Sequence, residues 1–267
     1  MIKKEKRKFK FSPLGIYAIL VYSFLYLPLV VVIIFSFSPT KTIYGLSGFT
    51  TKWYIRLFSD EALMRALIHS LQVSLTAIGI AVVIGTAGAF FLVRVNFPGK
   101  QFFRSLSQLP LILPGIILGI ALLVLFINLG FKLSMLTILV GHVCFTTPVV
   151  MFQVASRLQR MPRSYEYAAK DLGANTIQTF WYVTLPMIRT AIIGGALMAF
   201  TMSFDEIVIT YFLTGTWTTL PVFIYGMMRF GLSPQVYAIS TVVLTFSLFL
   251  ILLMGKFVTV RGEEVLR

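Results

Sequence analysis

Charged residues are scarce in this chain: Asp, Glu, Lys and Arg make up 12% of its 267 residues, and apolar residues make up 58%. A soluble domain carries about twice that share of charge. The many aliphatic and aromatic residues also exclude a disordered chain, which is poor in both. Together with a mean hydropathy of +0.90, this composition predicts a membrane protein.

Metal ligands and thiols are equally scarce. A single cysteine, Cys144, excludes an intramolecular disulfide and a cysteine-built zinc site. The two histidines, His69 and His142, lie 73 positions apart, which is no metal-ligand spacing. We therefore expect no metal site, and we expect these three residues to pack or to form hydrogen bonds.

A nucleotide-binding motif is lacking as well. No G-x-x-x-x-G-K-[ST] segment occurs, so the chain holds no P-loop with which to bind and hydrolyse ATP. We expect no catalytic residues and no cofactor bound by this chain. The sequence also shows no internal repeat and no low-complexity segment.

Long apolar runs are what the sequence does contain. A run of about 20 residues crosses a hydrocarbon core of ~30 Å as a helix, and six such runs predict an all-α, polytopic membrane protein. The first run follows a basic stretch, but it is too long for a signal peptide and no small-residue cleavage site follows it. The predicted spans lie near Leu14–Ser36, Leu67–Val93, Leu106–Leu129, Leu133–Ala155, Pro186–Thr210 and Tyr237–Val258.

The basic residues that produce the net charge of +14 are unevenly distributed. Seventeen of the 23 Lys and Arg lie at the two ends, in the loop after the second span and in the loop at 156–189; six lie in the other loops. Because basic loops stay in the cytoplasm, we expect both termini and the 156–189 loop there. The division is then a basic N-terminal segment at 1–13, a membrane domain at 14–258 and a C-terminal segment at 259–267.

Outside the membrane, residues 49–59 predict a short helix at the interface, capped by Thr50 or Thr51. Ser59 then precedes the second spanning helix, with acids in its first turn. The short helix groups four apolar or aromatic side chains on one side: Trp53, Tyr54, Leu57 and Phe58.

The 156–189 loop is the most patterned connector. Ser164 is predicted to cap a helix over 165–172, and Gly173 stands where a left-handed residue would end it. A second short helix follows from Asn175, and Pro186 falls in the first turn of the fifth span. A surface-lying amphipathic helix fits these features, and so does a docking element for a soluble partner.

Residues 166–186, EYAAKDLGANTIQTFWYVTLP, resemble the EAA loop of permease subunits of ATP-binding cassette importers. Tyr167 stands at the position of that loop's usual glutamate, with Glu166 displaced by one residue, and Thr190 stands where many relatives have proline. The matching positions are Ala168, Ala169, Asp171, Leu172, Gly173, Leu185 and Pro186.

Other segments resemble the C-type permease subunits of spermidine/putrescine importers. They are GFTTKWYIRLF at 48–58, FDEIVITYFLTG at 204–215, LP-x-x-IYGMMRFGLSPQV at 220–236 and H-x-x-F-x-x-P at 142–148.

This resemblance implies a type I (MetI-like) importer permease fold in a bacterial inner membrane and the import of polyamines. The implied partners are a second permease subunit that completes a heterodimer, two ATPase subunits that hold ATP and Mg, and an extracytoplasmic polyamine-binding protein. The 156–189 loop would then couple the chain to an ATPase. The coupling residues would be Glu166, Tyr167, Ala168, Ala169, Asp171 and Gly173.

Asp205 and Glu206 are the only acids within the predicted spans. An acid at the membrane centre costs at least ~2.5–3.5 kcal/mol, so it faces a partner or a water-filled cavity. Either the pair is structural and is neutralised by Arg229, Lys132 or the sister subunit, or it attracts a cationic substrate at the mouth of the path.

Three further residues are candidates for the substrate path. Ser203 adjoins the acid pair, and Trp53 and Tyr211 lie on outer segments, where cation–π contact competes with ordinary membrane anchoring. Broken helices often line cavities, although helix breakers are also common in spans. The predicted third span contains four of them: Pro110, Pro114, Gly115 and Gly119.

Two other functions stay open on the sequence. The same kind of permease can carry thiamine, iron or an oxyanion, but the acid pair argues against an oxyanion, which needs basic or helix N-terminal sites. An ion-coupled secondary transporter or channel needs buried ion ligands and often has inverted repeats. The sequence shows neither feature.

Overall fold

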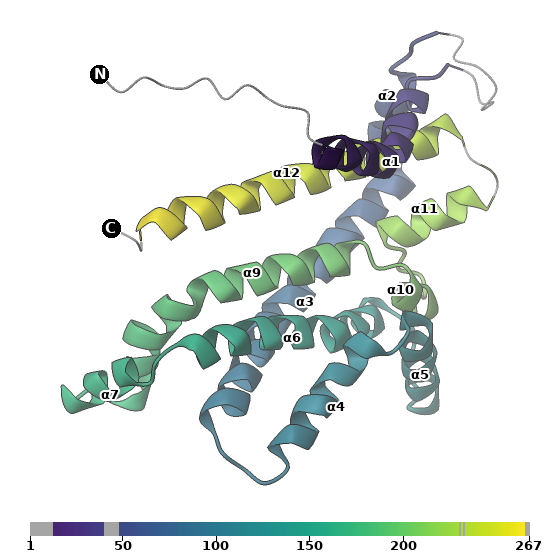
Figure 1. Ribbon diagram of the computed structural model, residues 1–267. Coiled ribbons are helices and arrows are strands. Elements are labelled where there is room, and N and C mark those ends of the chain that lie inside the picture. Colours follow the sequence, from purple (N-terminus) through teal and green to yellow (C-terminus); the bar gives the residue numbers. More distant parts are fainter. Residues whose placement is uncertain (1–12, 40–47, 230, 232, 265–267) are drawn as a thin grey trace, which may run out of the picture.

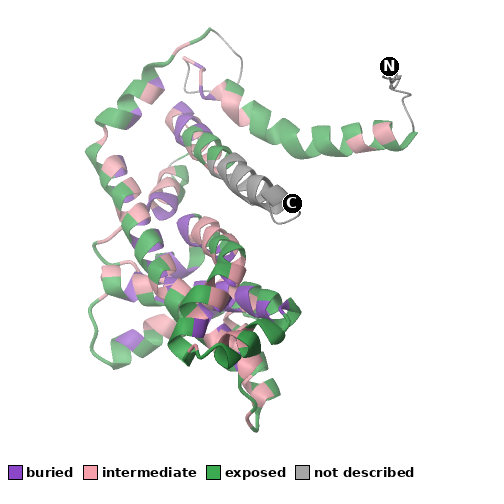
Figure 2. Cartoon of the chain, turned by 90° about the vertical axis from the view of Figure 1, so that its left-hand side faces the viewer, coloured by how far each residue is buried: buried purple, intermediate pink, exposed green. Residues whose placement is uncertain are grey.

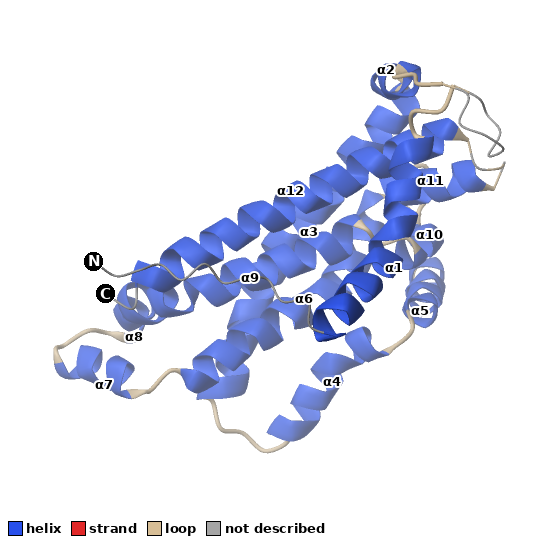
Figure 3. Ribbon diagram, turned by 45° about the horizontal axis from the view of Figure 1, so that its top comes forward, coloured by secondary structure: helices blue, strands red, loops and turns tan. Residues whose placement is uncertain are grey.

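The computed structural model describes residues 13–39, 48–229, 231 and 233–264, with side chains described as far as residue 249. Every regular element in these ranges is a helix, and Figure 3 shows helices joined by short loops. The all-α prediction is therefore confirmed. The predicted basic N-terminal segment lies almost entirely outside the described residues.

Thirteen helical elements follow one another in the described part of the chain (Figure 1). They are α1 (Pro13–Phe35), α2 (Lys52–Ser59), α3 (Glu61–Arg94), α4 (Lys100–Ile112), α5 (Gly115–Asn128), α6 (Met135–Arg160), α7 (Ser164–Asp171), α8 (Thr176–Thr179), η1 (Phe180–Thr184, a π-helix), α9 (Leu185–Phe204), α10 (Val208–Leu213), α11 (Leu220–Met228) and α12 (Pro234–Glu264).

Four helical runs among the described residues are long and apolar enough to cross a membrane: α1, α3, α6 and the continuous run from α8 to α9. The pair α4 and α5 passes the same test together but is bent by 101°. Helix α12 has 31 residues, and its fully described part, Pro234–Phe249, is a shorter apolar helix. The described residues thus contain four or five spans by this test, and the predicted number of six is not reproduced.

The predicted third span, Leu106–Leu129, is broken in the middle. Pro114 disfavours a helical conformation at the residue before it, and Leu113 is accordingly extended, with φ −66° and ψ 136°. Helix α5 restarts at Gly115. Pro114 and Gly115 therefore divide the span into two helices at a sharp angle, whereas Pro110 lies inside α4 and Gly119 inside α5.

The core forms where α3, α6 and α9 pack together. Small residues allow their backbones to approach closely: a Cβ added at Gly85 of α3 would lie 2.9 Å from the Thr147 carbonyl oxygen of α6. A Cβ added at Gly195 of α9 would lie 3.2 Å from the Cα of Val150. The residues buried around these crossings include Ala81, Ala89, Leu92, Val150, Met151, Val154, Leu158, Ile188 and Ala199.

Helix α2 forms as predicted, but its four apolar and aromatic side chains are not all on one side. Trp53 and Leu57 are buried, whereas Phe58, which was predicted on the same side, is 72% exposed. Thr51 stands at the N-cap of α2 without a side-chain cap bond. Asp60 caps α3, because its side chain accepts hydrogen bonds from two backbone N–H groups at the start of that helix.

Much of the apolar surface stays exposed. Helix α1 has no buried residue and contacts α12, and Figure 2 shows it as a largely exposed arm beside the rest of the chain. Helix α5 also exposes most of its apolar side chains. Such surfaces fit contact with lipid or with other membrane-spanning chains.

The crossing of α3 and α6 gives the first prediction. We expect Gly85→Val to destabilise the protein by about 1–3 kcal/mol, because the new side chain would meet backbone atoms that cannot move aside separately. Thermal unfolding of the purified protein in detergent measures the change. Gly79→Val in the same helix is the matched control, since nothing lies within 4 Å of its added Cβ. Equal unfolding temperatures for the two variants would contradict the prediction.

Candidate functional site

The 156–189 loop begins with α7, which starts at Ser164 itself, one residue earlier than predicted. Gly173 then has φ +89°, which confirms the predicted left-handed residue. The backbone N–H of Gly173 donates to Lys170 O at 2.9 Å, and that of Ala174 donates to Ala169 O at 3.0 Å. These two bonds form a Schellman motif, so the direction in which the chain leaves α7 is fixed.

The second half of the loop is a capped helix that continues into the membrane. The Asn175 side chain accepts from the Gln178 backbone N–H at 2.9 Å, and the Gln178 side chain accepts from the Asn175 N–H at 2.8 Å. This reciprocal pair is a capping box. Helix α8 then runs through the π-helix η1 into α9, with Pro186 in its first turn as predicted. A force on the loop is thereby applied to a spanning helix.

Several large apolar side chains are exposed on this loop. A group of exposed apolar residues of this kind marks a contact with another protein or with the membrane. Of the predicted coupling residues, Tyr167, Ala168, Asp171 and Gly173 are exposed, and Glu166 and Ala169 are half-buried. The exposed large side chains are Tyr165, Tyr167, Leu172, Ile177, Trp181 and Tyr182.

Glu166 has a partner that the sequence did not indicate. The Arg94 guanidinium donates from Nε at 3.1 Å and from Nη2 at 2.8 Å to Glu166 Oε1. The two side chains are only 15% and 16% exposed. Arg94 is the last residue of α3 and lies 72 positions from Glu166, so no local pattern could reveal this ion pair.

The second candidate region lies where α9 ends. The fifth span was predicted to continue to Thr210, but α9 stops at Phe204, and Asp205 follows as its C-cap. Glu206 Oε1 accepts the backbone N–H of Ile209 at 2.8 Å in the first turn of α10. The acids therefore lie at a break between two helices and not within a continuous span, because the Glu206 carboxylate binds the start of a new helix.

The two acids have different surroundings. Asp205 is exposed and Glu206 is half-buried. In the described part of the chain the only ion pairs are Glu61–Arg65 and Arg94–Glu166, so neither Arg229 nor Lys132 neutralises the acids within the chain. The Asp205 carboxylate makes no hydrogen bond to any described residue.

A buried polar cluster lies beside this break. His142 of α6 is 1% exposed, and its ring nitrogens bond to Ser203 Oγ at 2.7 Å and to Thr210 Oγ1 at 2.8 Å. Ser203 Oγ in turn donates to Ser74 Oγ of α3 at 3.2 Å. One imidazole thus links the end of α9 to α10. Ser203, a predicted pathway residue, is 2% exposed and serves this internal link.

Both predicted aromatic pathway residues already contact cations of the chain. Trp53 is 4% exposed, its indole N–H donates to Ser38 O at 2.8 Å, and the Lys52 and Arg56 side chains lie over its ring. The contacts of the Trp53 side chain are therefore with residues of its own chain. No described contact brings it to Asp205.

Tyr211 is 41% exposed and contacts Arg229. The Arg229 Nη2 donates to the Tyr211 hydroxyl at 3.1 Å, and the guanidinium lies 5.2 Å from the Tyr225 ring centroid. Hydrogen bonds to the Tyr225 and Tyr211 hydroxyls raise the pKa of Arg229. Tyr211 and Tyr225 therefore hold a cation between them in this structure.

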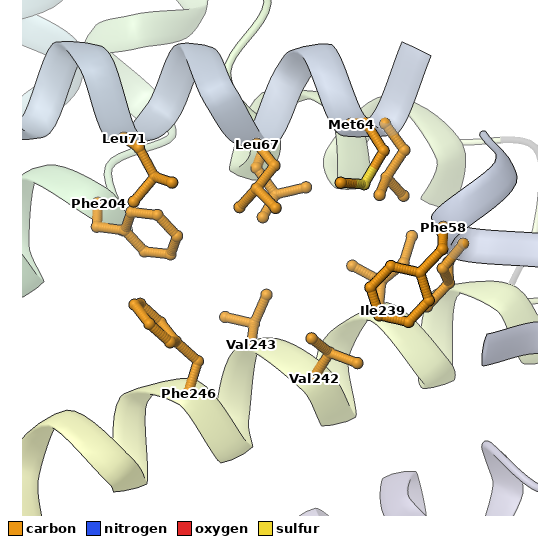
Figure 4. A pocket seen from close by; sticks show the side chains of 12 residues that line it. Phe58, Met64, Leu67, Leu71, Phe204, Ile239, Val242, Val243 and Phe246 are labelled. Carbon is orange, nitrogen blue, oxygen red and sulfur yellow. The ribbon is translucent and has the colours of Figure 1, made fainter. Parts of the chain in front are cut away.

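A separate cavity of about 190 Å³ lies between α3 and α12, with Phe58 of α2 at one end (Figure 4). Its lining side chains are apolar, among them Phe58, Met64 and Phe246. A polycation finds no counter-charge there, so this cavity does not extend the acidic region. Among the described residues, no group of three or more His, Cys, Asp or Glu could hold a metal ion.

Comparison of the sequence with known proteins identifies a family. The family described as binding-protein-dependent transport system inner membrane component matches residues 78–259. The chain is 39% identical over 231 residues to the putrescine transport system permease protein PotI of Escherichia coli (strain K12), covering 84% of this chain and 82% of that one. It is 36% identical to the spermidine/putrescine transport system permease protein PotC of the same strain, covering 87% and 88%.

Solved structures of ABC transporters have a fold similar to that of this chain. A bacterial ABC transporter involved in the import of the acidic polysaccharide alginate matches with a TM-score of 0.69 at 17% identity, covering 91% of this chain and 94% of that one. The MetNI methionine ABC transporter in an inward-facing conformation matches with a TM-score of 0.60 at 18% identity, covering 75% and 98%. At these identities the likeness concerns the fold.

Proposed function

The chain belongs to the binding-protein-dependent transport system inner membrane components, and we propose that it forms half of the translocation path of an ATP-driven polyamine importer. The observation that carries this proposal is the 36–39% identity, over most of the chain, to permeases named for putrescine and spermidine. A second permease subunit completes the path. An extracytoplasmic binding protein delivers the polyamine.

The exposed carboxylate of Asp205 supports a cationic substrate. It follows the end of a spanning helix and has no cation of its own chain within ion-pair distance among the described residues. At an effective dielectric of about 20, a cation 4 Å from a carboxylate gains roughly 4 kcal/mol before desolvation is subtracted. A polyamine passing this point supplies the missing positive charge.

The structure of the 156–189 loop fits a permease that is driven by a separate ATPase. The chain has no P-loop. The loop presents exposed apolar side chains, and its second half is a capped helix, α8, that continues through η1 into α9. In the proposed complex this loop docks on one of two ATPase subunits that hold ATP and Mg. Both termini then lie in the cytoplasm, as the distribution of basic residues favours.

The complex reconstituted in proteoliposomes tests the substrate and the role of the acids. We expect ATP-dependent uptake of putrescine or spermidine, and we expect Asp205→Asn to lower uptake per assembled complex about tenfold, since about 1.4 kcal/mol of lost attraction suffices. Glu206→Gln keeps an oxygen that can accept the Ile209 N–H, so its effect should be smaller.

Glu61→Gln is the matched control, because Glu61 is an exposed acid that already pairs with Arg65. Uptake at the wild-type level in assembled Asp205→Asn complexes would contradict a role in passing the substrate. A wild-type complex that imports neither polyamine would contradict the proposed substrate itself.

The docking role of the loop gives a separate prediction. Gly173→Val forces a β-branched residue into a left-handed conformation, which costs about 1 kcal/mol or more and redirects the chain after α7. We expect substrate-stimulated ATP hydrolysis to fall while the subunit still inserts into the membrane. Gly194→Val is the control, because its added Cβ meets nothing within 4 Å. Hydrolysis equal to that of the control would refute the docking role.

A further inference from the structure

The ion pair between Arg94 and Glu166 joins two elements that are far apart in the sequence. Arg94 ends α3, and Glu166 lies in the first turn of α7. Two guanidinium nitrogens of Arg94, Nε and Nη2, donate to the same carboxylate oxygen of Glu166, at 3.1 Å and 2.8 Å. The pair is mostly shielded from water, so it is less screened than an exposed pair and its geometry is held more firmly.

A second arginine reinforces the same junction. The Arg163 guanidinium donates to the carbonyl oxygens of Val93 at 3.3 Å and of Arg94 at 3.4 Å. These carbonyls belong to the last turn of α3, where unpaired acceptors and the negative end of the helix dipole attract a cation. Residues on both sides of the start of α7 therefore bind the same end of α3.

The aromatic rings of Phe90 and Phe180 extend this junction. Phe90 lies one turn before the end of α3, and its ring meets that of Phe180 edge to face, with centroids 5.2 Å apart. Phe180 is the first residue of η1, which continues into α9. The end of α3 thus contacts both halves of the 156–189 loop.

The other end of α3 contacts the outer segments. Ser70 Oγ accepts the backbone N–H of Leu220 at 2.7 Å, at the start of α11. The His69 ring bonds to the Thr218 carbonyl at 3.1 Å and stacks on Trp217. One continuous helix of 34 residues therefore connects the 156–189 loop to the outer segment that precedes α11.

We infer that Glu166 is a positioning residue, which, through Arg94, fixes α7 to the end of α3 so that a movement of the ATPase reaches α3 directly. This inference rests on the proposed docking of the loop on an ATPase. The Glu166 carboxylate is turned to its own chain, whereas the neighbouring Tyr167 is 55% exposed. Of the neighbours Glu166 and Tyr167, it is then Tyr167 whose side chain is available to the ATPase.

A double-mutant cycle in the reconstituted complex tests the inference. The variants are Arg94→Gln, Glu166→Gln and the double variant, together with the charge exchange Arg94→Glu with Glu166→Arg. The readouts are ATPase retained on the purified complex, ATP hydrolysis, and polyamine taken up per ATP hydrolysed.

We expect each single variant to retain its ATPase but to lower uptake per ATP about fivefold or more, the usual size of a coupling between two sites. The double variant should be no worse than either single variant, because both remove the same interaction. The charge exchange should recover most of the loss.

Other results would overturn the inference. If Glu166 binds the ATPase directly, Glu166→Gln releases the ATPase while Arg94→Gln behaves as wild type. If the residues act independently, their effects add in the double variant. Wild-type coupling in both single variants would also overturn it.

The exposed pair Glu61–Arg65 at the other end of α3 provides the matched control, since its atoms are 3.9 Å apart and its side chains are 87% and 67% exposed. Glu61→Gln and Arg65→Gln should leave uptake per ATP unchanged. A wild-type complex that fails to import polyamines would instead count against the proposed function. The two failures are thus told apart before any variant is compared.

Discussion

The close packing of α3 against α6 is the constraint on which the other features of this chain depend. At Gly85 the two backbones approach so closely that an added Cβ would lie 2.9 Å from a carbonyl oxygen of the partner helix. Lipid provides no hydrophobic force between helices, so such contacts between small residues hold a membrane protein together. They join α3, α6 and α9 into one block. The 156–189 loop is attached to one end of this block, and the segment that leads into α11 is attached towards the other.

Four acidic residues in and around this block have different surroundings. Asp60 caps α3, Glu206 binds the start of α10, and Glu166 holds the loop to Arg94. Each of these carboxylates is satisfied by its own chain. Asp205 differs from these three, because it is exposed and its carboxylate makes neither a hydrogen bond nor an ion pair to a described residue. The geometry therefore assigns structural tasks to three acids and leaves Asp205 available for a passing cation.

The sequence predicts the features that are set locally and misses those that depend on distant contacts. Run length locates four of the predicted spans, and the glycine at position 173 predicts the end of α7, since both signals are local. The apolar residues after Glu206 suggested a continuous fifth span, but α9 ends at Phe204, and Thr210 is instead bound by His142. The pairing of Glu166 with Arg94 spans 72 positions. A single sequence carries no local signal for contacts of that kind.

In this account, ATP-driven opening of the path is a rigid-body movement of the block, with the loop moving as part of it. The most direct test is to measure, by double electron–electron resonance, the distance between spin labels at Ser59→Cys and Tyr165→Cys in the assembled complex, on a Cys144→Ser background. Both sites are exposed. Ser59 ends α2, two residues before α3 begins, and Tyr165 lies in α7, which is bound to the other end of α3, a helix of about 50 Å. The account predicts one distance that is the same with and without ATP, while the distance from residue 165 to the second permease changes. A shift of several ångströms between residues 59 and 165 on ATP binding would contradict it.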